Sequence, residues 1–258
     1  MSKFFLKEIK KAGKLKNPVL IEGLPGIGNV ARIAVDYLTD KLKAVKYVEI
    51  YSYAFPNSVF INEDSTIVLP KIEIFIAKTK KRDLVLLVGD IQPIEEEESY
   101  LLCEEIIKLC KKLKISEVIT LGGIGLAKTS NNPSVCGAVS DKKFIPVFRK
   151  AGVKFDGNKT VGLIIGAAGL ILGLGRMEGI NGTALLGETV IRPDYVGIET
   201  SRAILNVINT YLGLNIELKE LDKEIKQWKR GNDAKENAEK QLLNMMVTRK
   251  KDELRYIG

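Results

Sequence analysis

Four polar residues stand at or just after the ends of apolar runs, where they could take part in acid–base chemistry. They are Glu22, Asp90, Gln92 and Glu188. Carboxyl groups at the carboxyl ends of parallel strands are well placed to bind a ligand and to exchange protons with it. One hypothesis is therefore a hydrolase or nucleoside-processing enzyme that uses carboxylates at strand ends, and it rests on fold analogy.

A structural role is the alternative for Asp90 and Gln92, and it is the favoured interpretation. Both residues precede an acidic segment, residues 95–98, that opens a predicted helix. Polar side chains before a helix commonly cap its first amides, and acidic residues in the first turn complement the helix dipole. We therefore expect this pair to cap the helix.

The absence of histidine excludes several classes of catalytic and metal site. No histidine occurs in the 258 residues, so Ser-His-Asp and Cys-His catalysis and imidazole-based zinc or iron sites are excluded. Three cysteines, Cys103, Cys110 and Cys136, form no C-x-x-C pair and leave one thiol over, which is typical of a reducing compartment. We interpret Cys103 and Cys110, two turns apart on a predicted helix, as buried apolar residues. We predict no metal and no cofactor.

A cluster of glycines follows the first predicted strand. Its spacing is Gly23-x-x-Gly26-x-Gly28, which differs from the dinucleotide fingerprint G-x-G-x-x-G. A phosphate-binding P-loop is also excluded, because Asn29 stands where that motif has lysine. Glycine permits the tight backbone that links a strand directly to a helix. We therefore interpret the cluster as a turn, with a small-anion site at the helix start as the alternative.

The net charge of +8 raises the possibility of a nucleic-acid partner. Lysines alternate with acidic residues along the predicted helices, however, and no aromatic residues interleave with a basic stripe. We therefore expect a mixed, solvated surface and no nucleic acid. No apolar run approaches the roughly 20 residues of a membrane span, and the first residues lack a signal-peptide pattern. The expected location is the cytoplasm.

Strands and helices alternate from residue 18 to residue 214, which predicts an α/β fold. The first strand is the short apolar run that starts at Val19, and further strand patterns occupy residues 44–53, 58–61, 66–69, 72–77, 83–90, 115–121, 135–139 and 183–188; residues 160–175 predict a strand, a turn and a helix. A second glycine turn, residues 122–125, is predicted at the end of the strand over 115–121. A helix follows the first glycine turn, with apolar residues at Ile33, Ala34, Tyr37 and Leu38, and further helix patterns cover residues 95–114, 142–151 and 194–212. The run over 83–90 is aliphatic throughout, as in a buried parallel strand. The crossover rule then predicts a three-layer α/β/α arrangement, with a mostly parallel sheet and an inserted antiparallel hairpin at 58–69.

The composition changes near residue 215. From Glu217 the chain is charged and favours helix, with apolar residues three and four positions apart. We therefore predict an α/β core domain over residues 1–214 and a helical C-terminal extension with a tail over 215–258. The apolar stripe is too short for an independent coiled coil, so it should pack on the core or on another subunit.

Five short motifs, taken in order, resemble those of archaeal homologues of the eukaryotic proteasome-assembly chaperones. The motifs are Glu22–Gly28, Gly89–Pro93, Gly122–Gly123, Gly166–Leu170 and Leu186–Glu188. The resemblance covers most of residues 18–214. It implies a phosphorylase/hydrolase-like three-layer fold and a cytoplasmic, non-enzymatic, homo-oligomeric protein that binds the proteasome core particle or an associated adaptor protein.

The resemblance also implies a role for the end of the chain. Relatives end in a hydrophobic-tyrosine-any tripeptide that docks between α-subunits of the core particle, which makes Leu254, Tyr256, Ile257 and Gly258 the expected partner-binding residues. Tyr256 stands third from the end here, where the pattern has tyrosine second. This departure argues against direct activation of the proteasome and leaves docking through the tail as the expectation. Several tails on one oligomer would strengthen a weak contact through effective concentration.

Overall fold

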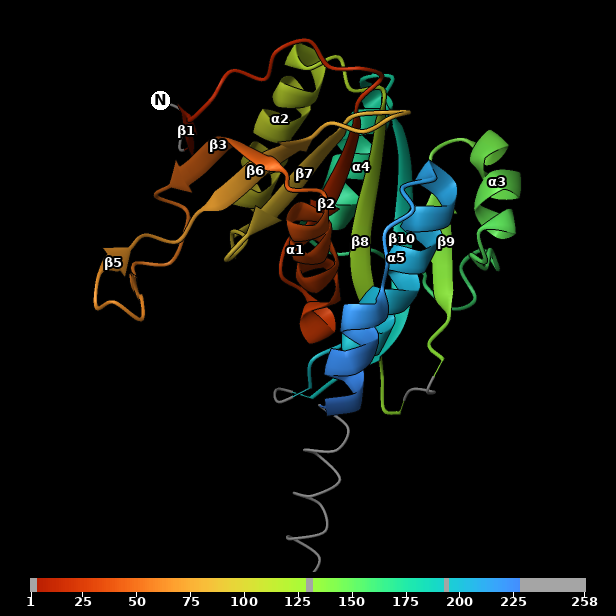
Figure 1. Cartoon of the computed structure of the whole chain (residues 1–258). Coiled ribbons are helices and arrows are strands. Elements are labelled where there is room, and N and C mark those ends of the chain that lie inside the picture. Colours follow the sequence, from red (N-terminus) through yellow and green to blue (C-terminus); the bar gives the residue numbers. More distant parts are fainter. Residues whose placement is uncertain (1–3, 129–131, 193–194, 228–258) are drawn as a thin grey trace, which may run out of the picture. The chain divides into compact units, whose positions relative to one another are not determined.

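The computed structural model describes residues 4–128, 132–192 and 195–227. By its internal contacts the chain divides into two units, residues 1–216 and residues 217–258. Within the described part of the first unit, eight strands form one mixed sheet that carries helices on both faces (Figure 1). Its strands are β1 (Phe4–Glu8), β2 (Val19–Gly23), β3 (Val45–Ser52), β6 (Ile72–Ala77), β7 (Leu84–Gly89), β8 (Glu117–Leu126), β9 (Val135–Val139) and β10 (Asn181–Val190). The helices are α1 (Val30–Lys41), α2 (Glu96–Lys112), α3 (Ile145–Lys150), α4 (Ala167–Met177) and α5 (Ile198–Leu212), with short 3₁₀ turns η1 (Ile27–Asn29) and η2 (Lys142–Phe144).

The sheet has the strand order β1-β3-β6-β7-β2-β8-β10-β9. Its centre, β7-β2-β8-β10, is parallel, while β1, β3, β6 and the edge strand β9 pair antiparallel. The predicted α/β class, with a large sheet between helices, is confirmed. The antiparallel half follows from the connections, because β3, β6 and β7 succeed one another without the helical crossover that parallel neighbours require. Between β3 and β6, β4 (Phe60–Ile61) and β5 (Ile67–Val68) pair as a separate antiparallel hairpin.

The helices leave the central strands toward opposite faces. α1 and α5 contact each other on one face, while α2 and α4 contact each other on the other (Figure 1). Side chains alternate along β2, so Gly23 faces Val35 of α1 whereas Leu20 joins the core under α2. Glu22, two residues from Leu20, therefore faces the α2 and α4 side.

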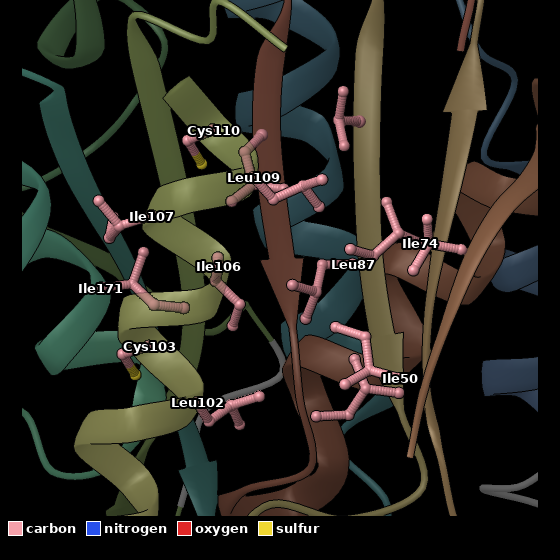
Figure 2. Close-up of a cluster of buried hydrophobic side chains, with 14 of the residues drawn as sticks. Ile50, Ile74, Leu87, Leu102, Cys103, Ile106, Ile107, Leu109, Cys110 and Ile171 are labelled. Atoms are coloured by element: carbon pink, nitrogen blue, oxygen red, sulfur yellow. The ribbon is translucent and has the colours of Figure 1, made fainter. Parts of the chain in front are cut away.

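The core under α2 is built from aliphatic side chains of several strands and two helices. Figure 2 shows Ile50, Ile74 and Leu87 of the sheet opposite Leu102 and Ile106 of α2, and all five are buried. Cys103 and Cys110 lie in the same cluster as free thiols, as their spacing predicted. Burial raises the pKa of each thiol to about 12, so neither is a reactive thiolate at neutral pH.

The second glycine run was expected to be a turn, and this prediction is wrong. Residues 122–125 lie inside β8, which continues to Leu126 in parallel register with β10. The physical reason is close packing: a Cβ on Gly123 would lie 2.4 Å from the carbonyl oxygen of Ile27. Glycine in the strand therefore lets η1 lie directly against the sheet.

Three further elements differ from the prediction: a strand that does not form, a helix that begins later, and a strand that was not predicted. Residues 160–166 form no strand; α4 begins at Ala167 after Gly166, whose φ of 84° favours glycine. Every strand of the sheet except the edge strands β1 and β9 already has two neighbours among the described residues, so the sheet offers this segment no interior position. The helix expected from residue 194 begins at Ile198, and Asp194 itself lies outside the described residues. β1 was not predicted, because alternation in five residues is a weak signal.

Candidate functional site

The glycine-rich turn after β2 carries the chain from the sheet into α1. Gly28 has a φ of 64°, a left-handed conformation that glycine adopts without steric cost. Gly23 lies against α1, since a Cβ there would be 2.5 Å from the carbonyl oxygen of Ala31 and from Cγ2 of Val35. These contacts give both glycines a role in the fold.

Glu22 is a buried carboxyl group at the end of β2, with 1% of its surface exposed. Its Oε1 accepts a hydrogen bond of 2.8 Å from the backbone amide of Leu24. Its Oε2 is buried and accepts no well-formed hydrogen bond from the described residues; the backbone amide of Leu121 lies near enough to the carboxyl group to favour its ionised form, but it does not complete a hydrogen bond. Burial raises the pKa of Glu22 to about 7, although the backbone amides of Leu24 and Leu121 partly oppose the shift. The group can therefore gain or lose a proton near neutral pH.

Gln92 joins the glycine-rich turn to the start of α4. Its Nε2 donates to the carbonyl oxygen of Pro25 at 2.6 Å, and its Oε1 accepts from the amide of Ala167 at 3.2 Å. Gln92 therefore caps α4, and the prediction that it caps the helix after residue 95 is wrong. Sequence spacing could not show this, because Ala167 lies 75 residues away.

Asp90 has a different structural role from the predicted cap. One carboxylate oxygen, Oδ1, lies 3.3 Å from Nη1 of Arg32, and the other accepts from the amide of Lys71 at 3.2 Å. Arg32 also donates to the carbonyl oxygen of Gly89 and pairs with Asp36 one turn along α1. Asp90 thus ties α1 to the ends of β6 and β7. Arg32 was not among the residues predicted from the sequence, because its only local signal is the i,i+4 spacing to Asp36.

Glu188 lies apart from the other three predicted residues. It stands inside β10, which extends two residues beyond it, and its Oε2 accepts from the amide of Ser134 at 3.0 Å. The contact holds the chain just before β9 against β10. The tertiary structure therefore does not bring the four candidate groups into one catalytic set.

A cleft of about 1110 Å³ lies at the carboxyl ends of the parallel strands, and we call it the strand-end cleft. Glu22 and Gln92 line it, whereas Asp90 and Glu188 do not. The remaining lining comes from the turn after β2, the start of α2, residues 121–125 of β8, residues 160–166 and the start of α4. The helices beginning here diverge to opposite faces of the sheet, which is where wound α/β folds commonly bind ligands.

A model of the PAC2 family matches residues 20–234. The chain belongs to the PAC2 family. Two structures from Pyrococcus furiosus are similar to this PAC2 protein. PbaB, described as an archaeal proteasome activator, is 30% identical with a TM-score of 0.85, over 92% of this chain and 100% of PbaB. PbaA, described as an archaeal homolog of proteasome-assembly chaperone, is 25% identical with a TM-score of 0.71, over 88% of this chain and 94% of PbaA.

A curated relative extends the similarity to the full length. The uncharacterized protein MJ1210 of Methanocaldococcus jannaschii is 32% identical over 100% of this chain and 99% of its own length. Together these similarities confirm the resemblance to archaeal homologues of proteasome-assembly chaperones, and they confirm the fold class.

The predicted partner-binding residues of the tail, Leu254, Tyr256, Ile257 and Gly258, lie outside the described residues. Within the described parts of the PAC2 protein, no group of three or more histidine, cysteine, aspartate or glutamate residues could hold a metal ion. In those same parts, no helix has both the length and the apolar character needed to cross a membrane.

Proposed function

We propose that this PAC2 protein is a non-enzymatic cytoplasmic partner of the proteasome that acts in assembly or regulation of the core particle. The observation that carries the proposal is the similarity to PbaB, an archaeal proteasome activator by description, over 92% of this chain at a TM-score of 0.85. PbaA, described as a homolog of proteasome-assembly chaperone, supports the same class of partner.

The positions of the predicted catalytic groups support a non-enzymatic role. Asp90 is held between Arg32 and the amide of Lys71, and Glu188 holds the amide of Ser134. Hydrogen bonds of this kind fix local structure, and they leave these two carboxylates outside the strand-end cleft. A hydrolase or nucleoside-processing enzyme would need such groups to converge on one substrate.

We further propose that the protein is a homo-oligomer and that its β4–β5 hairpin takes part in the subunit contact. The hairpin exposes large apolar side chains, with Ile61 at 76% and Ile67 at 70% exposure. In the connection that leads from β3 to the hairpin, Tyr53 is 87% exposed and makes an edge-to-face contact with the half-exposed Phe5, with ring centroids 5.0 Å apart. Grouped exposed apolar residues on a water-soluble surface commonly mark protein contacts.

The tail supplies the second part of the proposed contact. Leu254, Tyr256 and Ile257 give the charged segment that includes Gly258 its apolar groups. A tyrosine ring inserts into a recipient pocket as a rigid apolar group with a polar tip. A single tail should bind α-subunits of the core particle weakly, whereas several tails on one oligomer should bind usefully.

The test is a binding measurement between the full-length protein and immobilised core particle, combined with native mass spectrometry. Deleting residues 254–258 should abolish core-particle binding and leave the number of subunits in the oligomer unchanged. Replacing Ile61 and Ile67 by lysine should reduce the oligomer to smaller species and weaken binding while the tail stays intact. Undiminished binding by the truncated protein would refute docking through the tail, and failure of the wild-type protein to bind any proteasome component would refute the proposed function.

A further inference from the structure

The strand-end cleft contains a buried polar atom whose bonding capacity is unused. Glu22 lines the cleft, yet Oε2 has no hydrogen-bond partner among the described residues, while Oε1 is held by Leu24. A buried carboxyl oxygen without a partner costs free energy, and native structures generally supply a partner for such groups. Gln92, which also lines the cleft, donates from Nε2 to the carbonyl oxygen of Pro25 and accepts at Oε1 from the amide of Ala167, and it supplies no hydrogen bond to Oε2 of Glu22.

The charge of the lining indicates what kind of partner fits. The chain has 40 lysine and arginine residues against 32 acidic ones, yet the described residues that line the cleft include no lysine or arginine. Their only charged members are Glu22 and Glu96. An anionic ligand would find no countercharge here and would face two carboxyl groups. A cation would be attracted by both.

The apolar walls of the cleft indicate the chemistry of the rest of the ligand. Leu24, Ile27, Leu121, Ile164 and Leu186 contribute apolar surface to the cleft. The mouth is also apolar, because Ile94, Leu163 and Ile165 line it and are each more than 75% exposed. Sites with mainly apolar walls and one placed polar group select ligands with an apolar body and one matching polar end.

Strand pairing explains why the floor is open. The ladder between β2 and β8 ends at Glu22 and Thr120, whereas the ladder between β8 and β10 continues to Leu126. Beyond Thr120, one edge of β8 therefore has no strand of the described residues beside it, and its residues 121–125 line the cleft. Three of these five are glycines, and Leu186, Ile27 and Ile191 pack closely against them, so the cleft follows the unpaired edge of β8.

From these features we propose that the strand-end cleft binds a small organic amine, whose ammonium group pairs with Oε2 of Glu22 and whose hydrocarbon or aromatic body lies against Ile27 and Ile164. The proposal goes beyond the proteasome-related function and does not depend on it. No covalent step is involved; the ammonium replaces the missing hydrogen-bond partner and compensates the buried charge.

Binding of this kind depends on the protonation state of Glu22. The titratable groups on the packed elements are Glu96, Tyr100 and Cys103, all on α2, and neither the lining residues of β8 nor those of α4 add another. An ammonium ion pairs with the ionised carboxylate, so amine binding should strengthen as Glu22 ionises. With a pKa of about 7 for this group, the affinity should rise about 10-fold from pH 6 to pH 8.

The experiment uses isothermal titration calorimetry on the full-length protein with three probes of equal length: n-hexylamine, 1-hexanol and hexanoate. The amine should bind at least about 10-fold more tightly than the alcohol, and hexanoate should bind least. Glu22→Gln, which keeps the shape of the side chain and removes its charge, should weaken amine binding about 10-fold or more and abolish the pH dependence. Glu96→Gln, a matched change at the exposed rim, should weaken it about 2-fold or less.

Several results would overturn the proposal. If the alcohol binds as tightly as the amine, or if the amine binds more tightly at pH 6 than at pH 8, Glu22 acts as a neutral hydrogen-bond donor and the proposal fails. Equal amine binding by wild type and Glu22→Gln, or no amine binding at millimolar concentration, would reject the site. Should Glu22→Gln fail to fold, the probe comparison and the pH series on the wild-type protein decide the question. Loss of proteasome binding by the tail-truncated protein would leave amine binding unchanged, which separates the two proposals.

Discussion

Replacing Glu22 by glutamine should change how the stability of the protein depends on pH. The wild-type carboxyl group is fully buried, and its pKa is raised by that burial from 4.5 to about 7. Glutamine has nearly the same shape, can still accept the hydrogen bond from Leu24, and does not titrate. The difference between the two proteins therefore isolates the titration of this single group from that of all other carboxyls.

The sign and size of the expected stability difference follow from the pKa shift of Glu22. A carboxyl whose pKa is raised in the folded state binds its proton more tightly there than in the unfolded chain, so it stabilises the fold at low pH. That stabilisation is lost as the pH rises from about 4.5 to about 7. A shift of about 2.5 units corresponds to about 3 kcal/mol at full extent, of which about 2.5 kcal/mol falls between pH 5 and pH 8. Relative to wild type, Glu22→Gln should therefore be more stable at pH 8 than at pH 5 by this amount.

The assay is urea unfolding of both proteins at several values between pH 5 and pH 8, followed by circular dichroism and intrinsic fluorescence. The free-energy difference between wild type and variant should change by about 2.5 kcal/mol across this range. Glu96→Gln, at an exposed position of α2, serves as the control and should show almost no change. A difference for Glu22→Gln that stays constant within about 0.5 kcal/mol would refute the reasoning, because Glu22 would then be ionised in the folded protein throughout this range, as it is in the unfolded chain.

Three further predictions concern packing, charge and capping. Gly23→Ala should lower the free energy of unfolding by about 1–3 kcal/mol, because its Cβ would lie 2.5 Å from atoms of Ala31 and Val35. The control Gly26→Ala, where the backbone is extended and nothing lies within 4 Å of the new Cβ, should change it by less than about 0.5 kcal/mol. Similar losses for both variants in urea unfolding would contradict this prediction. Lys71, and after it Lys46, lowers the pKa of Glu49 to about 2. The ionised Glu49 therefore stabilises the fold above about pH 4.5, and this effect is lost as the pH falls toward 2. Glu49→Gln should lower the melting temperature at pH 7 and lower it less at pH 3. Gln92→Ala should speed hydrogen exchange at the first amides of α4, and unchanged exchange there would argue against the cap.

The sequence predicted helices and strands well where a hydrophobic pattern extended over many residues. The aliphatic run of β7 and the amphipathic pattern of α2 lie where their periodicity placed them, with Cys103 and Cys110 on the buried face. Prediction failed where glycine was ambiguous. A glycine run can mark a turn or a strand that allows another backbone to approach, and only the position of Ile27 over Gly123 distinguishes the two.

The candidate site was predictable only in part for a similar reason. The positions of Glu22 and Gln92 near strand ends placed them in the strand-end cleft. Asp90 and Glu188 satisfied the same rule, but their carboxylates contact Arg32, Lys71 and Ser134. Asp90 is 58 residues from Arg32 in the sequence, and Glu188 is 54 residues from Ser134. Such partners are fixed by packing between distant segments, and no local pattern records them.

The amino-acid sequence by itself determined the class of fold, the exclusion of histidine chemistry and the resemblance to proteasome-assembly-chaperone homologues, because periodicity, composition and short motifs are local properties. Only the tertiary structure decided which polar groups share a cavity and which hold the fold together. It also placed Glu22 at the strand-end cleft with 1% of its surface exposed, where Oε2 has no partner among the described residues. The ionisation of a carboxyl group depends on the burial and charges around it, and these arise only when strands and helices from distant parts of the chain pack together.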